Sequence, residues 1–317
     1  MIKITKGKQV APQRVVIYGP EGVGKSSFAS GLEAPIFLDA EKSTQELDVA
    51  RAEINSVRDM EQALAFLRDE PHQFKTVILD TIDWYEEQIA NSLCKKYKCD
   101  SITEIRDGFN NGYVILAEEL QKFLCALNKL SQTANVHVAL LAHSEVTPFK
   151  DPMLSSTYDR YSLKLTKKCK PLLKEWAEAQ LFYNYDTKLA DHKGTFGSKR
   201  GVGGSVRTIH TTHTAAYDAK NRHGLDESIS VPTAGEVPQV FFEKVFRKLD
   251  APKPTEVTET PTEAPSEFSE IVKQAGGESV VGDFLFGRGE KFPPSEDYQK
   301  RVLENPEAFI KAVKEGV

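Results

Sequence analysis

The chain has 317 residues, of which 40% are hydrophobic, and its formal net charge at pH 7 is −5. This length is enough for one large domain with an appendage, and the composition is that of a soluble globular protein. The longest apolar runs have the length of a strand, so no membrane span is expected, and residues 1–7 lack the apolar block of a signal peptide. Because the chain is acidic overall, a nucleic-acid site would have to be a local patch of cations.

The cysteine pattern indicates the compartment. Cys94, Cys99, Cys125 and Cys169 match neither a disulfide framework nor the spacing of a zinc site. We therefore expect a reducing, cytoplasmic environment.

Strand and helix signals alternate from the N-terminus to residue 249. Strands separated by helices form βαβ units, so the pattern predicts an α/β domain over residues 1–249 with a mostly parallel central sheet. The expected strands are 14–18, 35–39, 75–80, 136–142, 179–185 and 206–212, and the expected helices are 25–33, 59–69, 82–97, 110–131, 160–177 and 236–249.

A phosphate-binding loop joins the first expected strand to the first expected helix. It reads Gly19-Pro20-Glu21-Gly22-Val23-Gly24-Lys25-Ser26, with Ser27 next in the helix, and it fits the pattern G-x-x-x-x-G-K-[ST]. Glycines let the backbone wrap a phosphate chain, and Lys25 would neutralise its charge together with backbone N–H groups. Ser26 would hold Mg²⁺. The sequence therefore predicts a nucleoside triphosphate site.

Three later strands end in polar side chains, and ligand sites of open α/β sheets lie at that edge. Asp80 ends the run 75–80 and would hold Mg²⁺ through water. Glu41 follows the strand 35–39 and could orient water against the γ-phosphate, although a solvated acidic turn explains it as well. His143 ends the run 136–142 and could sense the γ-phosphate, although a lone histidine is more often structural.

Two basic segments follow. Lys220 and Arg222 are close enough in sequence to reach one phosphate chain and would be finger residues on a neighbouring subunit, or else they form a solvated turn. The Gly-rich loop 191–207 combines cations with a ring, as single-stranded nucleic acid requires, or is a hairpin loop kept soluble by charge. Its candidate DNA-binding residues are Lys193, Phe196, Lys199, Arg200 and Arg207. Loop 144–158 is a second candidate, with Phe149, Lys150 and Tyr158.

Together these motifs resemble the RecA-like P-loop ATPases, and especially the phage nucleotide-binding proteins that include the Sak-type recombination ATPases. The resemblance covers about residues 12–225. It implies that Glu41 activates water, that Asp80 is the Mg²⁺ aspartate, and that His143 replaces the RecA glutamine that couples ATP state to DNA binding. Lys220-Asn221-Arg222-His223-Gly224 is similar to the Lys-Asn-Arg-Phe-Gly motif of bacterial RadA and to the paired fingers of DnaB-type helicases.

The resemblance implies an ATPase that acts on single-stranded DNA in phage recombination, annealing or replication, in the host cytoplasm. It also implies a homo-oligomer, either a ring or a filament. Few residues precede the first strand, where RecA has its polymerisation element, so a filament is the less supported of the two. Alternatives are an ATP-dependent switch that recruits a replication or recombination partner with little turnover, and a small-molecule kinase with 191–207 as its lid. No Asn-Lys-x-Asp motif is present, which favours ATP over GTP.

The C-terminal part differs in composition. Residues 250–270 are rich in Pro, Thr and Glu and predict a disordered linker. Residues 271–317 are too few to fold well alone, and we expect a docking tail whose partner could be a single-strand-binding protein. Its Phe309-Ile310-Lys311-Ala312 resembles the Phe-x-x-Ala peptide with which some RecA relatives dock on the next subunit, although an amphipathic helix also explains it.

Overall fold

The computed structural model describes residues 6, 10–107, 110–153, 156–191, 199–249, 267–276, 281, 284–285 and 302–315. The chain divides into two compact units, Met1–Pro252 and Lys253–Val317. Within the described part of the chain, none of the helices has the length and apolarity needed to cross a bilayer.

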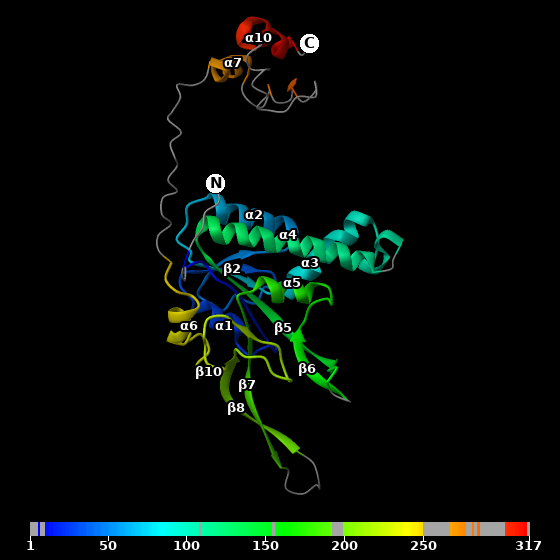
Figure 1. The fold of residues 1–317 in the computed structure, drawn as a ribbon, viewed down its shortest axis with the longest axis vertical. Helices are drawn as coiled ribbons and strands as arrows, with labels where there is room; N and C mark the ends of the chain where they lie inside the picture. The colour runs from blue at the N-terminus through cyan, green and yellow to red at the C-terminus, as the bar shows by residue number, and fades with distance from the viewer. Residues whose placement is uncertain are drawn as a thin grey trace. The chain divides into compact units, whose positions relative to one another are not determined.

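The first unit is built on one central sheet (Figure 1). Its strand order is β10-β8-β7-β1-β5-β4-β2-β3, with β6 paired to β5 and β9 paired to β7. All pairs from β3 across to β7 are parallel, whereas β7 with β8 and β8 with β10 are antiparallel. The predicted mostly parallel α/β sheet is therefore confirmed. The strands are β1 (Arg14–Gly19), β2 (Pro35–Asp39), β3 (Ala50–Glu53), β4 (Thr76–Asp80), β5 (His137–Lys150), β6 (Thr157–Leu163), β7 (Ala179–Asp191), β8 (Lys199–His210), β9 (Lys220–Asn221) and β10 (Ser228–Val231).

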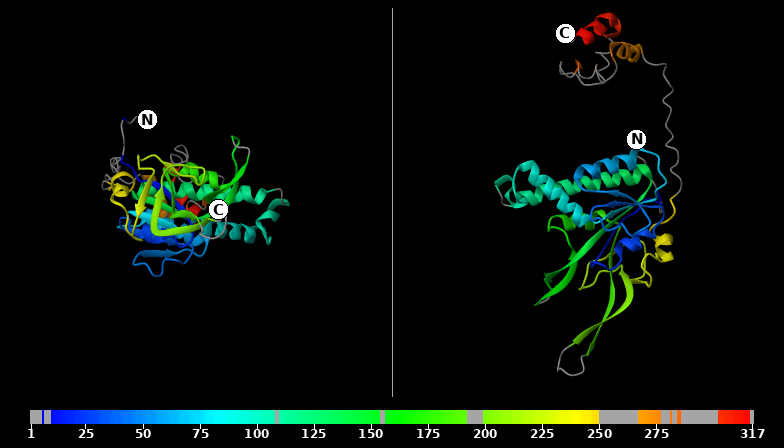
Figure 2. Two further views of the ribbon diagram at one scale, coloured as in Figure 1. Left: turned by 90° about the horizontal axis from the view of Figure 1, so that it is seen from below. Right: turned by 180° about the vertical axis from the view of Figure 1, so that it is seen from behind.

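Helices cover both faces of the sheet, as Figures 1 and 2 show. Side chains alternate along β1, so Val16 and Tyr18 enter one buried cluster while Val15 and Ile17 enter the other. The first cluster packs against α2 (Val57–Asp69), α3 (Ile82–Tyr97), α4 (Asn111–Ala134) and α5 (Cys169–Trp176). The second packs against α1 (Lys25–Ser30) and α6 (Gln239–Lys244). The short helix η1 (Ile102–Asp107) lies against α4.

The expected helix 160–177 is wrong in its first part. Thr157–Leu163 is strand β6, which pairs with Ser144–Lys150 as β5 continues past the sheet, and the helix α5 begins only at Cys169. The segment contains Thr157, Tyr158 and Tyr161, residue types that favour strands, and it pairs with the end of β5, which helical periodicity could not reveal. Similarly, part of the expected loop 191–207 is strand, because β7 reaches Asp191 and β8 starts at Lys199; residues 192–198 lie outside the described residues.

The second unit has its own buried cluster. Helices α7 (Glu267–Ala275) and α10 (Pro306–Glu315) contribute Ile271, Phe309 and Val313, and the ring of Phe309 lies edge-on to Phe284 at 6.1 Å between centroids. Phe309 of the tetrapeptide is thus packed inside this unit. Residues 250–266, most of the expected linker, lie outside the described residues, and Glu267 already belongs to α7.

A candidate nucleotide-binding site

The register of the parallel strands brings four strand ends to one edge of the sheet. Gly19 of β1 lies opposite His143 of β5, and Asp39 of β2 lies opposite Asp80 of β4. Since β5 runs between β1 and β4, His143 is placed between the phosphate loop and Asp80. This is the carboxyl edge, where open α/β sheets bind ligands.

The phosphate loop depends on glycine at specific positions. Gly22 and Gly24 have φ of 72° and 98°, a left-handed conformation that strains any side-chain-bearing residue. At Gly19 a Cβ would lie 1.9 Å from the carbonyl oxygen of Tyr183, so the close approach of β1 to β7 also requires glycine. The sequence pattern therefore has a direct backbone cause.

Lys25 is buried at the start of α1, with 5% of its surface exposed. Its Nζ donates hydrogen bonds to the carbonyl oxygens of Gly19 at 3.1 Å and Pro20 at 2.9 Å. Burial lowers the pKa of Lys25, and the carboxylates of Asp80, Asp83 and Glu41 oppose this shift. A phosphate oxygen would offer the ammonium a stronger, charge-assisted partner than these neutral carbonyls.

Asp80 carries an unsatisfied oxygen. Its Oδ2 accepts a hydrogen bond from Ser43 Oγ at 3.2 Å, whereas its Oδ1 is buried without a hydrogen-bond partner. Burial raises the pKa of Asp80, and the hydroxyls of Ser26 and Ser43 oppose the shift. An orphaned carboxylate oxygen next to a hydroxyl suits Mg²⁺, which prefers oxygen ligands and keeps water and phosphate ligands as well. No cluster of three or more His, Cys, Asp or Glu side chains suited to a metal exists among the described residues, so phosphate and water would have to complete the shell.

Asp39 shapes the loop that carries Glu41, a role that the sequence did not reveal. Its Oδ1 accepts from the backbone N–H of Lys42 at 2.7 Å, and its Oδ2 accepts from Thr44 Oγ1 at 2.5 Å. The backbone N–H of Glu41 in turn donates to the carbonyl oxygen of Asp80 at 3.1 Å. These bonds hold Glu41 beside Asp80.

Glu41 and His143 face each other. His143 Nε2 lies 3.7 Å from Glu41 Oε1, and Glu41 keeps 24% of its side chain exposed. Burial raises the pKa of Glu41, His143 and Lys25 oppose this shift, and the nearby carboxylates of Asp80 and Asp83 add to it. A raised pKa makes the carboxylate a stronger base, which suits a group that accepts a proton from water.

Asp83, which sequence reasoning missed, holds His143 from the other side. Its Oδ2 lies 2.8 Å from Nδ1 of the ring, and its Oδ1 accepts from the backbone N–H of His143 at 2.9 Å. In sequence, an acidic residue in the first turn of a helix reads simply as a favourable partner of the helix dipole. That ordinary explanation conceals the contact with β5.

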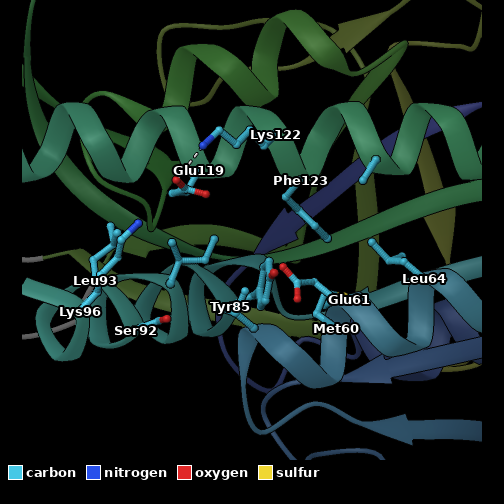
Figure 3. Close-up of a pocket in the computed structure, with 13 residues that line it drawn as sticks. Met60, Glu61, Leu64, Tyr85, Ser92, Leu93, Lys96, Glu119, Lys122 and Phe123 are labelled. Carbon is cyan, nitrogen blue, oxygen red and sulfur yellow. Dashed lines mark hydrogen bonds and ion pairs between the residues drawn. The ribbon is translucent and has the colours of Figure 1, made fainter. Parts of the chain in front are cut away.

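Lys25, Asp80 and the pair Glu41–His143 line a cavity of about 350 Å³. Its walls are the phosphate loop and α1 from Gly22 to Ser27, together with Glu41, Ser43, Asp80 and His143. A second cavity of about 350 Å³ lies between α2, α3 and α4, where Met60, Tyr85 and Phe123 supply an apolar wall (Figure 3). It lies on the helical layer and has no phosphate-binding backbone, so we assign the nucleotide to the first cavity.

Arg207 lies against the phosphate loop. Its Nε donates to the carbonyl oxygen of Val23 at 2.8 Å, and its guanidinium lies 5.3 Å from the ring centroid of Tyr185. The hydroxyl of Tyr185 donates to the carbonyl oxygen of Gly22 at 3.0 Å. The base of the β7–β8 hairpin is thereby attached to the loop. Among the other candidate DNA-binding residues, Lys193 and Phe196 lie outside the described residues, and only the backbone of Lys199 and Arg200 is described, as part of β8.

The structure places Lys220 and Arg222 away from the phosphate loop of their own chain. Lys220 Nζ donates to the carbonyl oxygens of Lys174 at 2.8 Å and Ala177 at 2.5 Å, at the end of α5. Arg222 is mostly exposed and pairs with Glu178 at 3.1 Å. Because β9 pairs with Ala179, at the amino end of β7, both cations lie near the opposite edge of the sheet. These two cations could therefore contact a nucleotide only if it were bound to another subunit.

Comparison with known proteins agrees with this geometry. The profile of the AAA_24 family, described as AAA domain, matches residues 11–223. The chain belongs to this family. The matched segment of this chain contains the phosphate loop, Glu41, Asp80, Asp83 and His143, and it ends just after Arg222. The chain is therefore a P-loop protein of the AAA type.

Other similarities are weaker. No curated protein matches the chain significantly. Among solved structures, the crystal structure of the RadB recombinase superposes with a TM-score of 0.38 and 15% sequence identity, covering 69% of this chain and 87% of that one. A superposition at this level carries no conclusion about function.

Proposed function

We propose that this AAA-domain protein binds ATP with Mg²⁺ and hydrolyses it. The supporting observation is that one cavity brings together the ammonium of Lys25, the orphaned oxygen of Asp80 and the pair Glu41–His143. These groups supply, respectively, a counter-charge, a metal ligand and a base with its neighbour. Phosphoryl transfer needs little more than such positioning and charge stabilisation.

Each residue has a defined task in this proposal. Lys25 exchanges the carbonyls of Gly19 and Pro20 for phosphate oxygens, and the loop N–H groups hold the phosphate chain. Ser26 and Asp80 hold Mg²⁺, which supplies charge neutralisation at the phosphates when bound. Glu41 accepts a proton as water attacks the γ-phosphorus, the bond from phosphorus to the bridging oxygen breaks, and ADP leaves with that oxygen.

We further propose that the protein is RecA-like in action and works on single-stranded DNA in phage recombination, annealing or replication. The β5–β6 hairpin supports this proposal, because it exposes Phe149 and Met153, the latter 92% exposed. Phe149 lies edge-on to Tyr158 at 5.6 Å, and the next residue, Lys150, is an exposed cation. Arg160 also lies 5.0 Å from the ring centroid of Phe149, but it is buried and paired with Asp218, so it supports the ring and is not free to bind a phosphate. Rings beside cations bind single strands by stacking and charge. Lys199 and Arg200 of the β7–β8 hairpin, with Lys193 and Phe196, remain a second DNA-binding proposal.

We place the active form in a homo-oligomer, since Arg222 is exposed and far from its own phosphate loop. There it would reach the nucleotide of a neighbour. The second unit would bind a protein partner, such as a single-strand-binding protein.

The test measures ATPase rate with and without single-stranded DNA. Lys25→Ala should remove nucleotide binding or turnover. Glu41→Gln should keep binding while slowing hydrolysis by about 10²–10⁴-fold, the usual contribution of a general base. Glu33→Gln, at an exposed glutamate, is the matched control. Normal turnover by the Glu41→Gln variant would refute the assignment of the base. Tight ATP binding without turnover would favour the switch, and labelled phosphate on anything but water would favour the kinase.

A further inference from the structure

The buried contact between α3 and β5 joins Asp83 to His143. Both side chains are nearly inaccessible, at 6% and 7% exposure, and Asp83 uses both carboxylate oxygens on this one residue. Oδ1 accepts the backbone N–H and Oδ2 faces the ring nitrogen Nδ1. The imidazole is therefore fixed both in position and in rotation.

The chemistry of Asp83 determines where the ring carries its proton. Burial is the largest single influence and would raise the pKa of Asp83, but the contacts with His143 and Thr81 together outweigh burial and lower it. An ionised carboxylate can only accept hydrogen bonds, so Nδ1 must be the protonated nitrogen. In the neutral ring Nε2 then holds a free lone pair.

That lone pair points toward the base of the proposed reaction. Nε2 and Glu41 Oε1 are 3.7 Å apart, too far for a direct hydrogen bond, and both are acceptors when the ring is neutral. A water molecule that donates one hydrogen to each would satisfy both groups. The same contact would leave the water oxygen lone pairs free to face a γ-phosphate.

We propose that Asp83 is a positioning residue for ATP hydrolysis, which holds His143 in the Nδ1–H tautomer so that Nε2 and Glu41 together orient the attacking water. This inference rests on the proposed ATPase function. In the reaction the proton of the water passes to Glu41, and His143 retains the second hydrogen bond without taking a proton. His143 thus acts as a fixed acceptor beside the base.

Asp83→Asn tests this role, because it keeps the shape of the side chain and moves the ring proton of His143 from Nδ1 to Nε2. The amide oxygen can still accept the backbone N–H of His143, whereas the amide nitrogen donates to Nδ1 and moves the ring proton to Nε2. We expect kcat to fall by about 10²-fold or more, within the range of acid–base contributions, while KM for ATP changes less than threefold. Glu87→Gln, an exposed residue of the same helix, is the control and should match the wild type.

A double-mutant cycle separates this role from general support of the fold. In a His143→Gln background, Asp83→Asn should cost little further rate, because its effect passes through the imidazole. If it costs as much there as in the wild type, the inference is overturned.

The tautomer can be measured without turnover. Nitrogen-15 chemical shifts of the His143 ring in the wild-type protein should show Nδ1 protonated and Nε2 free, and the opposite assignment overturns the inference even if Asp83→Asn does not fold. Failure of the proposed function gives a different result, in which the wild type shows no ATPase activity above the Lys25→Ala variant. A wild type that hydrolyses ATP no faster than a folded Asp83→Asn variant leaves the function intact and removes only Asp83 from it.

Discussion

Arg207 offers a direct choice between two roles, a DNA contact or a support of the phosphate loop. The sequence groups it with the cations of 191–207, whereas the structure bonds it to Val23 and stacks it on Tyr185. Replacing it with alanine removes one charge-assisted hydrogen bond, which contributes about 1.5–3 kcal/mol, and one cation–π contact, which contributes about 0.5–1 kcal/mol. Arg207 is only partly buried, so the lower end applies, about 2 kcal/mol.

If that energy holds the loop in its binding conformation, Arg207→Ala should weaken ATP binding by about thirtyfold, since about 1.4 kcal/mol is a factor of ten. Isothermal titration calorimetry with a non-hydrolysable ATP analogue measures this loss. Tyr185→Phe should lose less, because it keeps the ring and removes only the hydroxyl bond to Gly22. Arg58→Ala removes the same charge from an exposed site on α2 and should change nothing.

A salt titration of DNA binding tests the alternative, in which Arg207 contacts DNA. A cation that meets a phosphate of a single strand contributes about −0.7 to the slope of log affinity against log salt. ATP affinity within twofold of the wild type, together with a slope shallower by about 0.7, would place Arg207 on DNA and refute its role on the loop.

Three further predictions concern DNA, the subunit interface and pH. Phe149→Ala should weaken single-strand binding by about 1–3 kcal/mol without changing the slope of log affinity against log salt. Replacing both Lys199 and Arg200 with alanine should flatten that slope by about one unit. If none of these substitutions changes DNA binding, neither hairpin binds DNA. Arg222→Ala should cut ATPase activity by up to about 10³–10⁵-fold, and mixing it with Lys25→Ala subunits should restore some activity, whereas confirmed mixed assemblies without rescue would argue against a role in trans. Burial lowers the pKa of His137 from 6.5 to about 4 in the folded protein. As the pH falls, the unfolded chain therefore binds a proton at His137 before the folded protein does, and the free energy of unfolding decreases between pH 6.5 and 4. Between pH 7.5 and 5 this loss is about 2 kcal/mol, and urea unfolding should show it in the wild type but not in His137→Gln.

The parts of the site that the sequence predicts are those whose physics is local. The phosphate loop is specified by glycines with positive φ inside eight residues, and Asp80 and His143 follow from their places at the ends of apolar runs. Parallel pairing then brings these strand ends together without any further information. The same argument extends to Glu41, which lies two residues past β2.

The site residues that the sequence did not predict depend on contacts between segments that are far apart in the chain. Asp83 lies 60 residues from His143, and Arg207 lies 184 residues from Val23. Each has a sufficient local explanation, a helix dipole for one and a basic loop for the other, so nothing in the sequence requires the distant partner. Lys220 shows the same limit, since its basic motif gives no sign of the α5 carbonyls that it caps.

Strand β5 connects the chemistry to the surface. Its first half, from His137 to His143, is buried between β1 and β4, and its second half pairs only with β6 and carries the exposed ring of Phe149. His143 is the last buried residue before this change, and Asp83 fixes its backbone as well as its ring. A γ-phosphate that displaces the ring of His143 would therefore break the bond to Asp83 Oδ2, and one that displaces its backbone would break the bond to Oδ1. Because a packed core resists continuous deformation, we expect the β5–β6 hairpin, which continues β5 beyond His143, to change position between nucleotide states.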